Sequence, residues 1–124
     1  MTKGNCTVLK ANEYMHQHVG SEQSGCFYFS ALDIPAGAVA RAARIEVRDT
    51  DDVLHQHRGA VVAFITAGNG IFKTKEGNIS VATGDTIYIP AMTPHLSIAD
   101  KGTVMIEHIV YLGPANEWQD SLPA

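Results

Sequence analysis

The feature that most constrains this fold is the regular recurrence of short segments rich in Val, Ile, Thr, Tyr and Phe. Gly, Asp, Asn and Pro separate these segments at intervals of about eight to twelve residues, a spacing typical of all-β domains. Helical periodicity is not sustained anywhere in the chain. The pattern predicts strands over residues 26–32, 39–48, 60–66, 70–74, 79–82, 86–89, 95–98 and 103–112.

The turn sequences between these segments predict how the strands pair. Residues 67–70 read AGNG and residues 76–78 read EGN, and both contain residues that tolerate positive φ in tight hairpins. Consecutive strands are therefore expected to pair as antiparallel hairpins. Because an open sheet would leave unpaired edges, we expect the strands to close into a barrel or jelly roll.

The length of 124 residues and the mass of 13.3 kDa suit one compact domain. Hydrophobic residues make up 45% of the chain, which is enough apolar material to fill a core without disulfide staples. We expect an N-terminal arm or edge strand over residues 1–25, a barrel over residues 26–113 and a C-terminal tail over residues 114–124.

The charge balance narrows the classes of partner. The nine Lys and Arg and thirteen Asp and Glu give a net charge of −4, with no block of like charge. This argues against a nucleic acid or an anionic membrane surface as the partner. Residues 1–10 lack the apolar run of a signal peptide, and no stretch approaches the length of a membrane span. We therefore expect a cytoplasmic protein whose Cys6 and Cys26 are free thiols.

Two histidines, His55 and His57, stand two positions apart. On an extended backbone, residues i and i+2 point to the same face, so both imidazoles can reach one ion. Two ligands do not hold a catalytic metal, and a third has to come from another part of the chain. Downstream, residues 84–90 (GDTIYIP) read as a turn, a strand and a stop, and His95 follows shortly after them.

These two segments resemble the paired motifs of the cupin family. The first motif is a histidine pair followed by a glutamate and a glycine hairpin, and here it runs over residues 55–70 (HQHRGAVVAFITAGNG). The second is a Gly-Asp strand that ends in proline before a final histidine, and here it runs over residues 84–95. With the flanking strands, the resemblance covers about residues 35–112. It implies an antiparallel jelly-roll barrel, also called a double-stranded β-helix, and a homodimer.

Carried over residue by residue, the resemblance places His55, His57 and His95 at the metal-ligand positions. It implies a divalent metal cofactor, iron first, with zinc, nickel or manganese as alternatives. Val61 stands where the family usually has a glutamate ligand, and a valine side chain has no lone pair to offer a metal. Met92 replaces the usual glycine of the second motif, a change that we interpret as structural.

The missing carboxylate leaves two interpretations of the histidines. One is a barrel that has lost its metal and keeps three histidines as a polar or ligand-binding cluster. The other is an open metal site, which we favour because buried neutral imidazoles need partners and a metal gives each of them one. Three neutral ligands also leave the ion its full charge and open positions for water, dioxygen or a substrate.

A second histidine pair, His16 and His18, is followed by Glu22 and matches the first cupin motif in isolation. No hairpin glycines follow this pair at the right distance, and no predicted strand precedes it. We interpret it as part of a solvated arm. The alternative is an arm that folds over the barrel and supplies Glu22 as a fourth metal ligand.

The last predicted strand is apolar on both faces except at the neighbouring residues Glu107 and His108. One of the two has to point into the barrel, and the family pattern favours Glu107. A carboxylate near a metal-bound water or a substrate serves as a general base, so the predicted catalytic groups are Glu107 and, as its alternative, His108. The competing interpretation is a surface Glu-His pair at the mouth of the barrel.

Cupins with three histidines and no glutamate are similar to the iron-dependent group that oxidises small molecules with dioxygen. The resemblance therefore implies a small-molecule dioxygenase. The first alternative is a lyase, isomerase or cyclase without redox chemistry, in which Zn, Ni or Mn polarises a carbonyl while Glu107 or His108 moves a proton. The second alternative is a non-catalytic module that binds a sugar or an acid, because this barrel fold hosts many functions.

Overall fold

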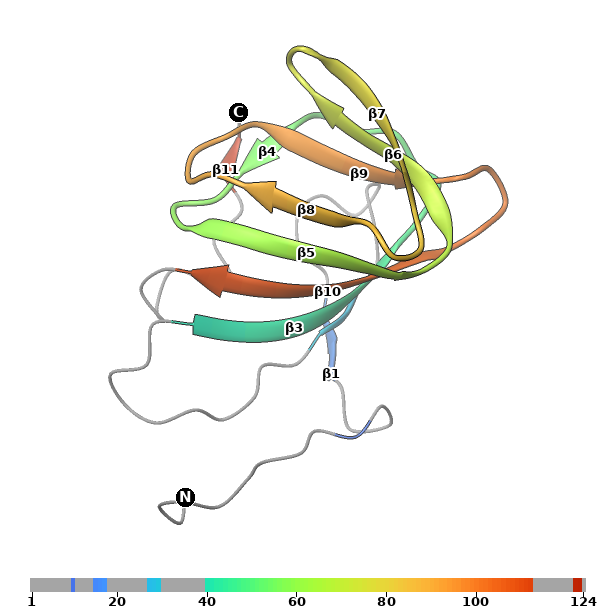
Figure 1. Ribbon diagram of the computed structural model, residues 1–124, viewed down its shortest axis with the longest axis horizontal. Coiled ribbons are helices and arrows are strands. Elements are labelled where there is room, and N and C mark those ends of the chain that lie inside the picture. Colours follow the sequence, from blue (N-terminus) through green and yellow to red (C-terminus); the bar gives the residue numbers. More distant parts are fainter. Residues whose placement is uncertain (1–9, 11–14, 18–26, 30–39, 113–121, 124) are drawn as a thin grey trace.

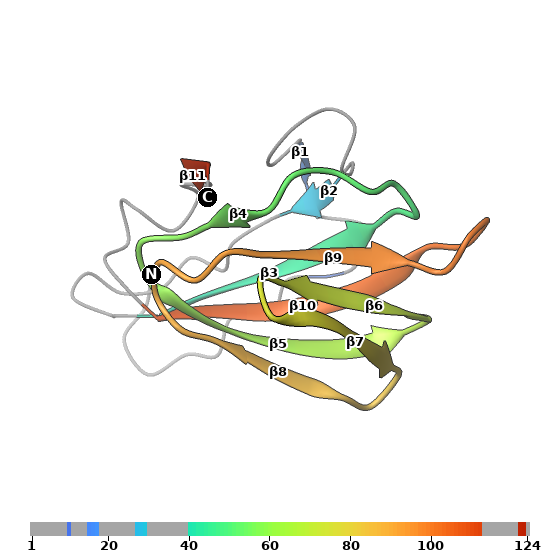
Figure 2. The same cartoon turned by 90° about the horizontal axis from the view of Figure 1, so that it is seen from above.

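Two facing antiparallel sheets form the body of the molecule (Figures 1 and 2). The computed structural model describes residues 10, 15–17, 27–29, 40–112 and 122–123. All regular secondary structure within these residues consists of β-strands, which confirms the all-β prediction. The strands are β1 Met15–Gln17, β2 Phe27–Phe29, β3 Ala40–Val47, β4 His55–Gln56, β5 Ala60–Ala67, β6 Asn69–Thr74, β7 Gly77–Ala82, β8 Thr86–Ile89, β9 His95–Ala99, β10 Met105–Leu112 and β11 Leu122–Pro123.

Each sheet draws most of its strands from distant parts of the chain. One sheet has the order β3-β10-β5-β8, and the other has the order β11-β4-β9-β6-β7. A separate two-stranded sheet pairs β1 with β2. All of these pairs are antiparallel, and the two larger sheets lie face to face (Figure 2). This arrangement is the predicted cupin jelly-roll barrel.

The predicted strands from residue 39 onward correspond to β3 and to β5 through β10, with ends that differ by two residues or fewer. β2 lies inside the strand predicted over residues 26–32, whose ends fall outside the described residues. The sequence rhythm did not predict β4 and β11, because each is only two residues long and carries no periodic pattern.

The prediction of a hairpin over residues 67–70 is wrong. β5 and β6 belong to different sheets, so this turn carries the chain from one sheet to the other. Gly68 has a φ of 88°, and a Cβ on it would lie 2.8 Å from the Val104 carbonyl oxygen. A Cβ on Gly70 would overlap the Ile98 carbonyl oxygen. The glycines are therefore required by close packing at the crossing, whereas the EGN turn does close a hairpin between β6 and β7.

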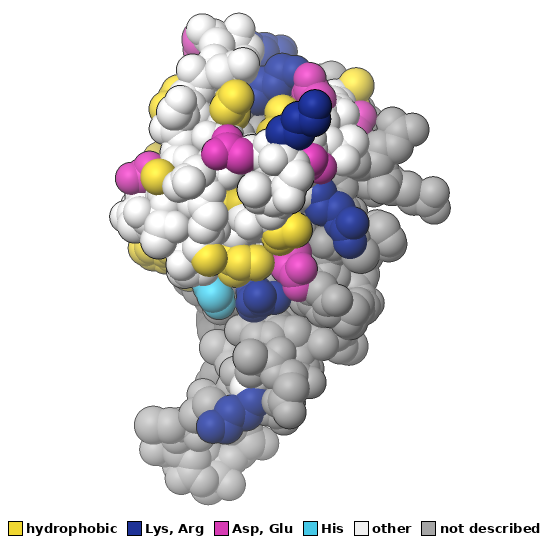
Figure 3. Space-filling view, turned by 90° about the vertical axis from the view of Figure 1, so that its right-hand side faces the viewer, with side chains coloured by type: hydrophobic (Ala, Val, Ile, Leu, Met, Phe, Trp, Pro, Cys, Tyr) yellow, Lys and Arg dark blue, Asp and Glu magenta, His cyan; other side chains and the backbone are white. Residues whose placement is uncertain are grey.

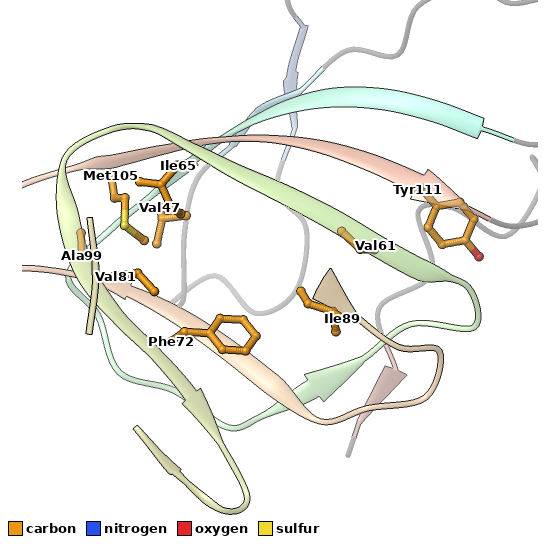
Figure 4. Close-up of a cluster of buried hydrophobic side chains, with 9 residues drawn as sticks. All are labelled: Val47, Val61, Ile65, Phe72, Val81, Ile89, Ala99, Met105 and Tyr111. Atoms are coloured by element: carbon orange, nitrogen blue, oxygen red, sulfur yellow. The ribbon is translucent and has the colours of Figure 1, made fainter. Parts of the chain in front are cut away.

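Alternation along β5 separates the interior of the barrel from its exterior. Val61, Ala63 and Ile65 are buried, whereas Phe64 between them is 42% exposed. This alternation turns the apolar row of β5 toward the space between the sheets. The core contains Val47, Val61, Ile65, Phe72, Val81, Ile89, Ala99, Met105 and Tyr111 (Figure 4).

The two ends of this core differ in character. Met105, Ile65 and Val47 gather at one end, while Tyr111 lies at the opposite end (Figure 4). β4 and the start of β9 also lie at the Tyr111 end, where β10 finishes (Figures 1 and 2). The histidine-bearing strands are therefore at the end of the barrel away from the apolar Met105 cluster.

Charged side chains of both signs are interspersed over the part of the surface that is coloured in Figure 3. No large patch of one sign forms on the described part of that face, in keeping with the scattered charges of the sequence. No helix among the described residues is long and apolar enough to cross a membrane.

Candidate metal centre

Three histidines converge at the Tyr111 end of the barrel. His55 in β4 is the register partner of His95, the first residue of β9. His57 follows β4 by one residue. Each residue offers one ring nitrogen, and these three atoms lie within 4.8 Å of one another. The ring centroids are 4.5 to 5.1 Å apart. The structure thus brings together the three residues that the cupin motifs single out.

The loop between β8 and β9 is bound to the backbone of the histidine pair. The Met92 amide donates a 2.7 Å hydrogen bond to the His57 carbonyl. Met92 has a φ of 54°, a left-handed conformation that costs a non-glycine residue about 1–2 kcal/mol. The family's usual glycine at this position is explained by that backbone conformation. Met92 keeps this conformation and its strain beside His57.

A second backbone contact orients the His95 ring. Its Nδ1 lies 2.8 Å from the Thr93 carbonyl oxygen, which can only accept a hydrogen bond. Nδ1 therefore carries the ring proton, and Nε2 keeps a free lone pair. A histidine that binds a metal usually donates its other ring nitrogen to an acceptor in this way.

Burial keeps two of the imidazoles uncharged. Burial, followed by repulsion from His95 and His57, lowers the pKa of His55 from 6.5 to about 3. Burial also lowers the pKa of His95 to about 4, although the hydrogen bond to Thr93 opposes the shift. Both rings are therefore neutral near pH 7, and the neutral imidazole is the form that binds a metal.

Apolar side chains form the surroundings of the cluster. Phe72 of β6 stacks on the His95 ring, with centroids 5.8 Å apart and planes inclined by 17°. Val61, at the position of the usual glutamate, is 4% exposed and belongs to the core. No carboxylate joins the three histidines within the described part of the chain. The donor set is thus three nitrogens, which suits Zn, Fe or Ni better than the hard ions Ca and Mg.

Two surface contacts anchor the segment that leads from β3 to His55. The Asp49 carboxylate accepts a 2.7 Å hydrogen bond from the Gly102 amide. Asp51 forms an ion pair with Lys73 of β6, with 2.8 Å between Oδ1 and Nζ. These contacts tie the segment to the β9–β10 turn and to β6, and so they limit where His55 can lie.

Glu107 lies between the two sheets. It is 5% exposed, and the hydroxyl of Ser97 from the opposing sheet donates a hydrogen bond to its carboxyl. Ser97 stands two residues after His95 in β9, so both side chains leave the strand on the same face. Burial raises the pKa of Glu107, while the Ser97 hydrogen bond opposes the shift. The Glu107 Oε2 atom has no hydrogen-bond partner among the described residues.

His108 is placed differently from its neighbour Glu107. Its Nδ1 lies 3.1 Å from the hydroxyl of Thr66, an exposed residue of β5. Burial and the positive charge of Arg44 lower the pKa of His108. Of the two candidate catalytic groups, Glu107 is thus the one that faces the same interior as His95.

Sequence reasoning missed Ser97. The signal was present, because the two-residue period that links His55 with His57 also puts Ser97 on the face of His95. What could not be predicted is that β10 brings a carboxyl opposite it.

The second histidine motif cannot be placed against this site. β1 contains the backbone of His16, but its side chain is not among those described. His18 and Glu22 lie outside the described residues, as do Cys6 and Cys26.

Comparison with protein families gives one match that spans most of the barrel. The model of the family described as "AraC-like ligand binding domain" matches residues 42–121, more than half of the 124 residues. Among curated proteins, no relative matches the chain.

Solved structures share the fold at low sequence identity. A cupin 2 conserved barrel domain protein from Rhodopseudomonas palustris has a TM-score of 0.69 and 22% identity, over 89% of this chain and 76% of its own. The polyketide cyclase RemF from Streptomyces resistomycificus has a TM-score of 0.74 and 16% identity, over 97% and 86%. The DMSP lyase DddQ from Ruegeria pomeroyi DSS-3 has a TM-score of 0.61 and 17% identity, over 69% and 43%. Likeness at these identities shows the fold alone.

Proposed function

We propose that this chain, which belongs to the AraC-like ligand binding domain family of the cupin superfamily, is an enzyme. The proposed enzyme depends on a metal ion and acts on a small molecule. One observation carries the proposal: three histidines offer ring nitrogens within 4.8 Å of one another inside a barrel of the cupin fold. The lowered pKa values of His55 and His95 support it, because these rings are ready to bind an ion without first losing a proton.

His55, His57 and His95 would hold the divalent ion through one nitrogen each. When bound, such an ion supplies Lewis acidity toward an oxygen atom of the substrate. The Thr93 carbonyl fixes the ring of His95, so that its Nε2 is presented for binding. The apolar wall that includes Phe72 excludes water, which strengthens the electrostatic interactions inside the site.

Glu107 is the group that moves a proton in this proposal. Its carboxyl is buried, held by Ser97, and on the interior face that it shares with His95. A buried carboxyl whose pKa is raised takes up a proton more readily than an exposed one, and it can return that proton to a bound molecule. This favours a lyase, isomerase or cyclase, in which a proton is removed from carbon next to a carbonyl that lies within reach of Glu107. The printed names of two structural neighbours, a polyketide cyclase and a lyase, point in the same direction.

A dioxygenase is the second candidate function. The observation that favours it is the donor set, since Val61 leaves an iron site with three neutral ligands and open positions. A non-catalytic ligand-binding module is the third candidate, and the description of the matching family favours it.

Hydrogen–deuterium exchange into simple carbonyl compounds tests the proton-transfer proposal and does not require the natural substrate. Protein loaded with Zn, Ni or Mn is incubated in D₂O with a panel of small ketones, diketones and keto acids. We expect deuterium to enter carbon next to the carbonyl of at least one compound, with or without dioxygen. Glu107→Gln should bind metal as the parent does and lose the exchange, because the amide cannot take up the proton.

Two results would favour another of the three candidate functions. Near-stoichiometric iron in protein purified without added metal, together with substrate-dependent uptake of dioxygen, would assign the dioxygenase instead. Metal-dependent binding of compounds from the panel with neither exchange nor oxygen uptake would assign the binding module.

A further inference from the structure

The Glu107 carboxyl has a hydrogen-bonding capacity that the described protein does not use. One oxygen is held by Ser97, whereas Oε2 is buried and has no partner among the described residues. An unpaired polar atom inside a protein costs about 1–3 kcal/mol, so its retention calls for a partner other than the described residues. Because Ser97 approaches from the opposing sheet, the carboxyl lies in the space between the sheets.

The strand geometry sets the distance of this carboxyl from the metal centre. Ser97 lies two residues beyond His95 in β9. Two residues of an extended strand span roughly 7 Å, and both side chains leave the strand on the same face. Ser97, and with it the Glu107 carboxyl, therefore lies roughly 7 Å further into the barrel than His95. Phe72, the register partner of Ser97, stacks on His95 and so lies beside the path between them.

The charges around the carboxyl decide which chemical group it can take. Among the described residues, His95 and Glu107 are the buried polar or charged side chains, and neither Lys nor Arg is buried. An anionic group next to Glu107 would find no buried counter-ion among the described residues. Because burial raises the pKa of Glu107, its carboxyl is held toward the protonated form, and a protonated carboxyl donates a hydrogen bond.

We infer that Ser97 and Glu107 form a second polar binding point, which takes a neutral hydrogen-bond acceptor at the far end of a substrate whose near end binds the metal. The inference rests on the proposed metal centre. It defines the substrate class as a small molecule, apolar in its middle, with a metal-binding oxygen pair separated by roughly 7 Å from a carbonyl, ether or hydroxyl oxygen.

Matched chelators test this inference directly. Cobalt(II)-loaded protein is titrated with hexanohydroxamic acid, with its 5-oxo analogue and with its 5-ammonio analogue, and binding is followed by the cobalt absorption bands. We expect the 5-oxo compound to bind about three- to ten-fold more tightly than the parent hydroxamate, the gain of one net hydrogen bond. Glu107→Gln should keep most of this gain, because an amide also donates, and Glu107→Leu should abolish it.

The variants are chosen so that folding does not obscure the result. Leucine at position 107 removes a buried polar group and is expected to fold, and Val110→Thr is the matched control on the other face of β10. Equal affinity for the parent and 5-oxo compounds would overturn the inference and leave the metal centre standing. A preference for the 5-ammonio compound that is lost in Glu107→Gln would overturn it in favour of a cationic group. Failure of every hydroxamate to bind in a metal-dependent way would overturn both proposals.

Discussion

Val61 occupies the barrel wall at the position where the cupin motif usually provides a glutamate. It is 4% exposed and packs with the core, so an apolar contact stands in place of an anionic ligand. An ion held by three neutral nitrogens keeps its full positive charge and is a stronger Lewis acid than one that a carboxylate has partly neutralised. At the residue scale, this exchange sets the electrostatic character of the proposed site.

Val61→Glu restores the usual ligand type and tests whether position 61 faces the ion. In the metal-free protein the buried carboxylate has no partner, and we expect the free energy of unfolding to fall by about 3 kcal/mol. Zinc should recover more stability in Val61→Glu than it adds to the parent protein, because the new carboxylate can bind the ion. Urea denaturation with and without zinc measures both effects. Val61→Leu is the control without a ligand atom, and an equal zinc effect in the Glu and Leu variants would show that position 61 does not face the ion.

The buried carboxyl of Glu107 predicts a specific dependence of stability on pH. Its pKa is raised above the ordinary value of 4.5, so the folded protein binds this proton more tightly than the unfolded chain does. Its contribution to stability is complete below about pH 4.5 and is lost as the pH rises through the folded-state pKa. Glu107→Gln should therefore be more stable than the parent at pH 8, with a difference that shrinks toward pH 4. Urea midpoints of the metal-free proteins across this range test the prediction, and a difference that stays constant with pH would count against it.

At the scale of elements, strand positions were predictable because each strand carries its own apolar alternation. Pairing was not, because it depends on contacts between distant segments. β10 lies between β3 and β5. The alternation of apolar residues within these three strands does not indicate which strands pair. The AGNG turn was therefore predicted as a hairpin, although its glycines serve a crossing between the sheets.

Gly70 marks this crossing and can be tested by one substitution. A Cβ at this position would overlap the carbonyl oxygen of Ile98, a backbone atom that cannot move without disturbing the β6–β9 pairing. We expect Gly70→Ala to lower the free energy of unfolding by about 1–3 kcal/mol, as overpacking does in other cores. Asn69→Ala, at the neighbouring exposed position, is the matched control. Thermal unfolding of the two variants compares them, and equal stability would mean that the close approach at Gly70 is not required.

Part of the candidate site was likewise predictable from the sequence, and part of it was not. The pair His55 and His57 follows from the two-residue period of an extended strand, and His95 follows from the resemblance of its segment to the second cupin motif. The family pattern also favoured Glu107 over His108 as the inward residue, whereas its position opposite Ser97 needed the structure, because it depends on how the two sheets face each other.

At the scale of the whole molecule, the barrel separates two environments. Its interior is apolar except for the histidine cluster, the Ser97–Glu107 pair and the Tyr111 hydroxyl. Charges of both signs are scattered over the described part of the face that Figure 3 shows. The outer face of the β3-β10-β5-β8 sheet exposes large apolar side chains, among them Phe64, Tyr88 and Leu112. The homodimer implied by the cupin resemblance stays a prediction.

The central claim is that the three histidines form one metal centre, and calorimetric titration of metal-free protein with zinc tests it most directly. We predict one ion bound per chain in the parent and in Glu107→Gln, with a matching rise in melting temperature. His95→Ala should lose at least a factor of ten in affinity, because roughly 1.4 kcal/mol of binding free energy corresponds to each factor of ten and one of three ligands is removed. Zinc binding of equal strength in the parent and in His95→Ala, or no binding to either, would contradict the claim.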